Sequence, residues 1–124
     1  MNSSSPPSNA PFSAPPLPWH RVRVRADIEA LLAQASPDAP PLVIVTAPGL
    51  VSAAGPDWLP ALLEGLPRER LIPLADCGED AGFALASLTL GMGILAPEVG
   101  EAVRPRLLSI GAALGLPVLF ERPG

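Results

Sequence analysis

The chain has 124 residues, 48% of them hydrophobic, which is enough for one folded domain with a sizeable core. Its formal net charge is −4 and it contains no lysine, so Schiff-base catalysis and a P-loop lysine are excluded and a nucleic-acid partner is disfavoured. With a single cysteine, no intrachain disulfide can form, and we expect a cytoplasmic location.

The N-terminal segment, residues 1–18, is predicted to be a disordered tail. It holds 6 of the chain's 18 prolines, together with Ser and Asn and no charged residue. This composition has too little apolar bulk to offset the entropy lost on ordering. A polyproline partner motif at residues 14–18 is the alternative interpretation. We expect residues 19–124 to form the folded domain.

The first strand is predicted at residues 20–24, where polar and apolar residues alternate. Val22 and Val24 should face a core, while the arginines between and after them should face water. A strand with one solvated face suits the edge of a sheet. A helix is predicted at residues 26–35, and the proline-rich run 36–41 ends it because proline cannot continue a helix.

The clearest strand in the sequence is residues 42–46. It is apolar, rich in β-branched residues and uninterrupted, which favours a central position covered on both faces. Residues 50–55 are expected to form a loop or a short turn of helix. A helix should follow at residues 56–66, where Trp58 and several leucines recur at helical spacing.

The rest of the chain continues to alternate between strands and helices. Pro105 indicates that the last helix properly begins near Arg104, since proline is tolerated in a first helical turn. The remaining predicted elements are strands 71–75, 92–96 and 117–121 and helices 80–90 and 98–114.

This alternation predicts a single three-layer α/β/α domain, with a mainly parallel five-stranded sheet and helices on both faces. A flavodoxin-like strand order, 2-1-3-4-5, is the first expectation. The alternative is the sequential order 1-2-3-4-5, which agrees better with the one-sided pattern of the first strand.

A ligand site in such a sheet would lie at the carboxyl ends of the strands. The acidic turn after the third strand, Asp76–Asp80, and the loop after the second strand, 46–55, should form this rim. Its carboxylates could hold Mg²⁺ through oxygen ligands. In the alternative interpretation, one carboxylate caps the following helix and another is solvated. The candidate ligand-binding residues are Thr46, Gly49, Ser52, Asp76, Gly78, Glu79 and Asp80.

The same segment contains glycines at defined positions around a strand, a helix and a second strand. The residues that carry the pattern are Asp76, Gly78, Gly82, Gly91 and Gly93. The pattern resembles the phosphate-binding βαβ unit of (βα)₈ barrels. The resemblance implies that backbone N–H groups at the helix N-terminus could bind a phosphate. The neighbouring carboxylates would repel such an anion.

The sequence offers little for catalysis. Cys77 lies far in sequence from the only histidine and beside carboxylates that would raise its pKa, so we expect a buried, inert thiol. No catalytic residue, metal site or cofactor is predicted. We also expect no membrane partner, because the uncharged segments are short for a spanning helix.

Two functional hypotheses follow. The first is a non-catalytic regulatory or protein-interaction module, for which the high apolar content makes a homodimer plausible. The alternative is a small-molecule-binding protein or minimal enzyme that takes a phosphate-containing ligand or Mg²⁺ at the rim.

Overall fold

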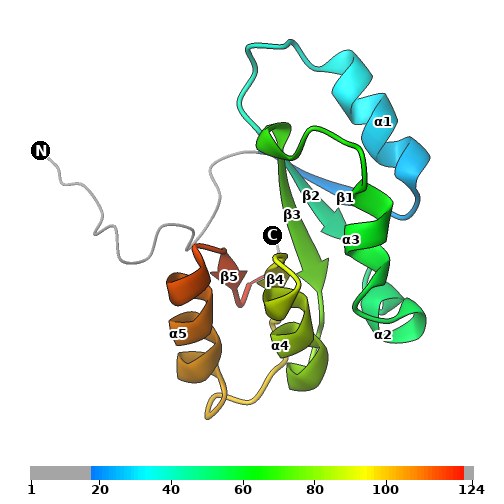
Figure 1. Ribbon diagram of the computed structural model, residues 1–124. Coiled ribbons are helices and arrows are strands. Elements are labelled where there is room, and N and C mark those ends of the chain that lie inside the picture. Colours follow the sequence, from blue (N-terminus) through cyan, green and yellow to red (C-terminus); the bar gives the residue numbers. More distant parts are fainter. Residues whose placement is uncertain (1–17, 122–124) are drawn as a thin grey trace, which may run out of the picture.

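Five strands form a parallel sheet in the order β1-β2-β3-β4-β5 (Figure 1). The structure is a computed structural model and describes residues 18–121. The predicted disorder of the tail therefore falls almost entirely on residues outside the described part. The strands are β1 Trp19–Val22, β2 Leu42–Thr46, β3 Leu71–Asp76, β4 Gly93–Leu95 and β5 Val118–Leu119. The helices are α1 Arg25–Gln34, α2 Leu50–Ala54, α3 Trp58–Leu63, α4 Ala81–Thr89 and α5 Arg104–Leu114, with a 3₁₀ turn, η1, at Arg68–Arg70.

The predicted class, an α/β domain with five parallel strands, is confirmed, but the flavodoxin-like strand order is not. The sheet has the sequential order that was the alternative, and β1 lies at its edge. Val22 is fully buried, as expected. Val24 is not, because the strand ends before it and Val24 is the exposed residue that precedes α1.

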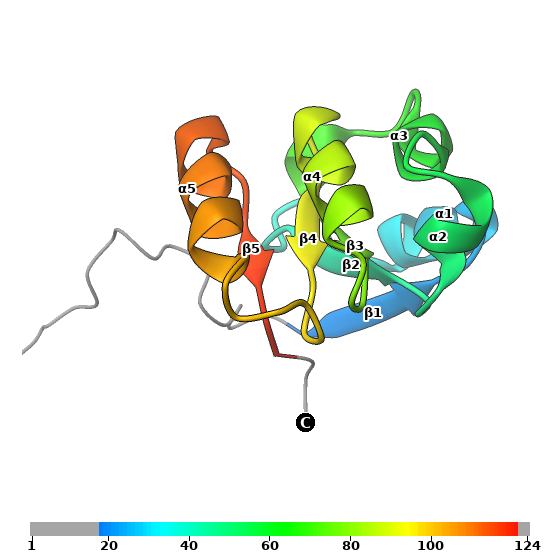
Figure 2. The same cartoon turned by 90° about the horizontal axis from the view of Figure 1, so that it is seen from below.

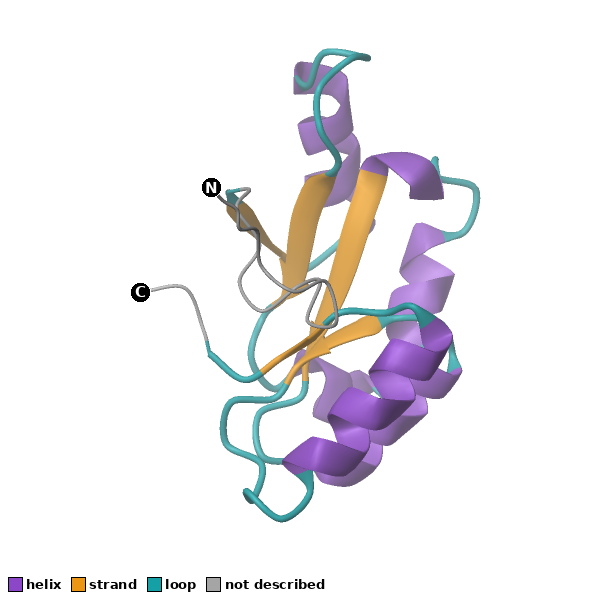
Figure 3. Ribbon diagram, turned by 90° about the vertical axis from the view of Figure 1, so that its left-hand side faces the viewer, coloured by secondary structure: helices purple, strands orange, loops and turns teal. Residues whose placement is uncertain are grey.

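The helices lie on one face of the sheet, rather than on both faces as expected (Figures 2 and 3). Right-handed crossovers between strands in sequential order always place the connecting helix on the same side. Each of the α-helices contributes side chains to one large apolar cluster, whose strand members include Ile44 and Ile94. The opposite face carries a second cluster built from strand residues, with Val43, Val45 and Leu74 at its centre.

The helix boundaries follow local signals in the sequence. Gly55 has a φ of 96°, which ends α2 and separates it from α3, so residues 50–63 contain two short helices. Pro105 lies in the first turn of α5, which begins at Arg104 as expected. None of the helices within residues 18–121 has both the length and the apolar composition needed to cross a membrane.

Pro73 lies inside β3, a strand with neighbours on both sides. The Cys77 N–H donates to the Leu95 carbonyl of β4, so the nitrogen of Pro73, four residues earlier, also points toward β4. The pairing between these strands begins only at Leu74 and Gly93. The missing N–H therefore falls before the start of β4, and no ladder bond is lost.

Two glycines allow β4 and β5 to pack closely against their neighbours. A Cβ atom added at Gly93 would lie 2.7 Å from Pro117 and 2.8 Å from Leu74. One added at Gly111 of α5 would overlap Val118 of β5. Both positions therefore need a residue without a side chain for steric reasons. The absence of side chains here lets β4 and α5 pack closely against β5 and its flanking residues.

Candidate functional site

The carboxyl ends of β1, β2 and β3 bring together Arg21, Thr46 and Asp76. The Arg21 guanidinium Nη1 donates to the Thr46 carbonyl oxygen at 2.6 Å and to Asp76 Oδ2 at 2.9 Å. The Asp76 side chain is fully buried, whereas 38% of the Arg21 side chain is exposed. Arg21 thus reaches from the edge strand across β2 and supplies a cation to a buried carboxylate.

Thr46 fixes the backbone at the end of the ladder between β2 and β3. Its hydroxyl oxygen accepts a hydrogen bond from the Asp76 N–H at 2.9 Å. Thr46 is buried, and its partner is the first residue of the predicted acidic turn. The side chain therefore continues the inter-strand pairing by one step and sets the position of Asp76.

The turn after β3 is held by its own side chains. Asp76 Oδ1 accepts a hydrogen bond from the Gly78 N–H at 3.2 Å, and Gly78 has a φ of 59°. Asp80 Oδ1 accepts from the Phe83 N–H at 3.0 Å and is the N-cap of α4. The capping interpretation of Asp80 is confirmed, and Glu79 is exposed beside it, as that interpretation expected.

Gly49 and Ser52 lie in the connection after β2. Gly49 has a φ of 83° and precedes the first residue of α2, and Ser52 is exposed on that helix. Neither takes part in the hydrogen bonds that join Arg21, Thr46 and Asp76. The predicted rim thus contains one connected group of side chains together with the separate turn of α2.

Cys77 follows Asp76 and is buried against the helix face of the sheet. Burial raises the pKa of its thiol to about 12, and the nearby carboxylates of Asp76 and Asp80 act in the same direction. A hydrogen-bonding contact with Ser87, at 4.0 Å from sulfur to oxygen, opposes this increase. The predicted burial of this thiol is confirmed, and its inertness stays a prediction.

These contacts limit what the rim can do chemically. The carboxylates of Asp76 and Asp80 and the hydroxyl of Thr46 all have partners within the chain. Within residues 18–121, no group of three or more His, Cys, Asp or Glu side chains is placed to hold a metal ion. The arrangement is suited to fixing three strand ends relative to one another.

Arg21 is the residue that the sequence interpretation missed, since it was assigned to water. Its signal was indirect: a carboxylate that directly follows a buried strand needs a compensating cation. Finding that cation required the strand order, because Arg21 and Asp76 come from strands separated by β2.

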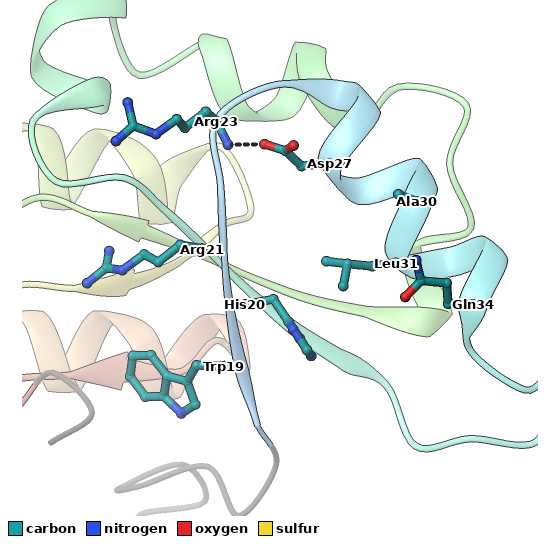
Figure 4. A pocket seen from close by; sticks show the side chains of 8 residues that line it. All are labelled: Trp19, His20, Arg21, Arg23, Asp27, Ala30, Leu31 and Gln34. Atoms are coloured by element: carbon teal, nitrogen blue, oxygen red, sulfur yellow. Dashed lines mark hydrogen bonds between the residues drawn. The ribbon is translucent and has the colours of Figure 1, made fainter.

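A groove of about 530 Å³ lies between β1 and α1, away from the predicted rim (Figure 4). Leu31 points from the helix toward the strand, and His20 projects on the same side of the strand as the helix. At one end, Asp27 accepts a hydrogen bond from the Arg23 N–H at 2.8 Å. The lining residues are Trp19, His20, Arg21, Arg23, Asp27, Ala30, Leu31 and Gln34.

Comparison of the chain with protein families, with curated proteins and with solved structures finds no match.

Proposed function

We propose that this chain is a non-catalytic protein-interaction module that forms a homodimer through the outer surfaces of α4 and α5. The single observation that carries the proposal is that most of the exposed large apolar side chains belong to two neighbouring helices. Of five large hydrophobic side chains exposed within residues 18–121, four belong to α4, α5 and the residue that follows α4. They are Leu85, Leu90, Leu108 and Leu114, with exposures of 39%, 42%, 48% and 52%.

The two helices lie side by side and run in the same direction (Figure 1). Leu85 and Leu108 are therefore near their middles, and Leu90 and Leu114 are near their C-terminal ends. We call the exposed surface around these four leucines the α4–α5 face. Large apolar side chains that are exposed on neighbouring helices are typical of protein contact surfaces.

Charge supports a second copy as the partner. No charged residue occurs in residues 81–97 or in residues 107–120, although the whole chain has a net charge of −4. In a twofold dimer the same surface meets itself, so any charge on it would meet a like charge nearby. The charged residues of α5, Arg104 and Arg106, are confined to its first turn, so the rest of the two helices avoids this repulsion. The uncharged, small side chains of Ala112 and Ala113, both exposed on α5, also permit close approach of helices.

The rim supports the non-catalytic part of the proposal. Its buried carboxylate is neutralised by Arg21, and the other groups described there bond within the chain. A ligand would have to replace these bonds at the cost of leaving a buried charge unpaired. The single buried cysteine is compatible with the cytoplasmic location that we propose.

Analytical ultracentrifugation of two charge variants tests the proposal. Leu85→Glu places a charge in the α4–α5 face and should convert the dimer to a monomer, because two carboxylates would be buried near each other. Val24→Glu is the matched control: Val24 is 54% exposed but lies before α1, outside that face. It should leave the dimer intact.

Circular dichroism and thermal melts of both variants establish that each remains folded, as expected for exposed positions. A Leu85→Glu chain that is folded and still dimeric would exclude this face. A thermal-shift panel with Mg²⁺, inorganic phosphate and nucleotides tests the alternative, since a ligand that binds the native state raises the melting temperature with its concentration.

A further inference from the structure

The outer edge of β1 has backbone groups that no described strand uses. β1 pairs with β2 alone, at one end of the sheet. The Val22 carbonyl accepts from the Ala47 N–H, on the β2 side of the strand. Since successive residues of a strand direct their N–H and C=O groups to opposite edges, those of Arg21 point outward. This edge can therefore bond an added strand.

The groove beside this edge gives an added strand somewhere to place side chains. It lies between β1 and α1. The helix lines it with Ala30 and Leu31 and with the polar Asp27 and Gln34, and the strand lines it with His20. Side chains of an added strand would alternate between this groove and the helix-free face of the sheet. Apolar side chains fit the part of the groove beside Ala30 and Leu31.

The charge of this edge differs from that of the whole molecule. Residues 20–25 contain three of the chain's eight basic residues, although the net charge is −4. Arg21 is paired with Asp76, and Arg25 with Glu29. Neither of these two described ion pairs includes Arg23, which is exposed.

Asp27 interacts only weakly with the Arg23 charge, which is the smallest of the causes that act on the pKa of Asp27. Asp27 accepts the backbone N–H groups of Arg23 and Val24, at 2.8 and 3.2 Å, and is committed to the start of α1. The Arg23 side chain points to the same side of β1 as Trp19 and Arg21, away from α1 (Figure 4). An acidic side chain of an added strand would meet it on that side.

We propose that the β1 edge binds an extended acidic segment of another protein by strand addition, with its apolar side chains in the groove and its carboxylates beside Arg23. A second copy of this chain fits less well. Antiparallel pairing of two β1 strands about Arg21 would place two Arg21 side chains directly opposite each other, which is unfavourable. The proposal is independent of the homodimer, because the α4–α5 face lies over β4 and β5, at the other end of the sheet.

A blocked, fluorescein-labelled peptide of sequence Thr-Val-Glu-Val-Glu-Val-Thr tests the proposal by fluorescence anisotropy. Its valines alternate with its glutamates, as the edge requires. We expect saturable binding to the full chain that weakens about three- to tenfold when both glutamates are replaced by lysine, the effect of reversing exposed ion pairs. N-methylation of the central valine, if the peptide pairs in parallel, or of a glutamate, if it pairs antiparallel, should weaken binding by a similar factor, since one strand-to-strand hydrogen bond is lost.

Charge reversal on the protein completes the test. Arg23→Glu should prefer the lysine peptide to the glutamate peptide, whereas Arg106→Glu, an exposed change on α5, should keep the original preference. Failure of the glutamate peptide to bind, or an unchanged preference in Arg23→Glu, would overturn the proposal. So would a light-scattering mass that halves on adding peptide, because the edge would then already hold a second copy.

Discussion

Arg21 shows how one side chain can connect three strands. It contacts the end of β2 through a carbonyl and the end of β3 through a buried carboxylate. Because an uncompensated carboxylate in a protein interior is costly, removal of this cation should affect the whole rim. The exposed part of the Arg21 side chain reduces the effect, since water can partly replace the guanidinium.

We expect Arg21→Gln to lower the free energy of unfolding by about 1–3 kcal/mol, the usual cost of leaving a buried polar group unsatisfied. Urea unfolding followed by circular dichroism measures this change. Arg23→Gln, directly after the same strand but in neither described ion pair, should change stability by less than about 0.5 kcal/mol. If both variants lost the same free energy of unfolding, the contact between Arg21 and Asp76 would contribute nothing to stability.

Cys77 should react with alkylating agents only when the chain unfolds. With a pKa of about 12, about 1 in 10,000 of the native thiols is ionised at pH 8, and the residue is also buried. Iodoacetamide labelling, followed by mass spectrometry with and without urea, checks this. Rapid labelling of the native chain would contradict the buried environment.

The raised pKa of Cys77 also predicts a pH dependence of stability. The unfolded thiol ionises near pH 8.5, so its ionisation favours unfolding above that pH while the native thiol stays neutral. The stabilisation is complete below about pH 8.5 and should fall by about 1 kcal/mol per pH unit between pH 9 and 11. Unfolding of Cys77→Ala over the same range should lack this slope. If the free energy of unfolding changed with pH in the same way in the wild type and in Cys77→Ala, the raised pKa of Cys77 would be disproved.

At the scale of elements, most strands and helices could be predicted from the sequence because each has a local cause. The apolar run of β2 and the Pro105 start of α5 are both found where the residues predict them. The end of β1 was predicted two residues late, because the alternation of Val22 and Val24 continues beyond the strand to the residue just before α1. The capping residue Asp80 was readable from its position before an apolar helix.

The close packing of β4 and β5 could not be predicted from the sequence, because it depends on contacts between residues that are distant in sequence. We expect Gly93→Ala to destabilise the chain by about 1–3 kcal/mol, since the new methyl group would overlap Pro117 and Leu74. Thermal unfolding measures this. Gly100→Ala is the control, because a Cβ there meets nothing within 4 Å. A Gly93→Ala chain as stable as this control would show that the packing relaxes freely.

At the scale of the whole molecule, the strand order determines which face of the sheet the helices cover and which strand lies at an edge. Sequential order places the helices on one face and leaves β1 as an edge. Apart from the one-sided pattern of the first strand, local patterns do not distinguish this order from a flavodoxin-like one, because both use the same right-handed βαβ units. Of the predicted site, Thr46 and Asp76 do meet, but Arg21 fills the position where a ligand was expected.

The mass of the wild-type chain in solution is the measurement that bears most directly on the homodimer. Light scattering should be recorded from about 1 to 200 µM, a range suited to a small specific interface. The expected mass rises to twice 12.8 kDa for the wild type, while Leu108→Glu, in the α4–α5 face, stays at 12.8 kDa. A wild-type mass of 12.8 kDa at every concentration would contradict the proposed homodimer.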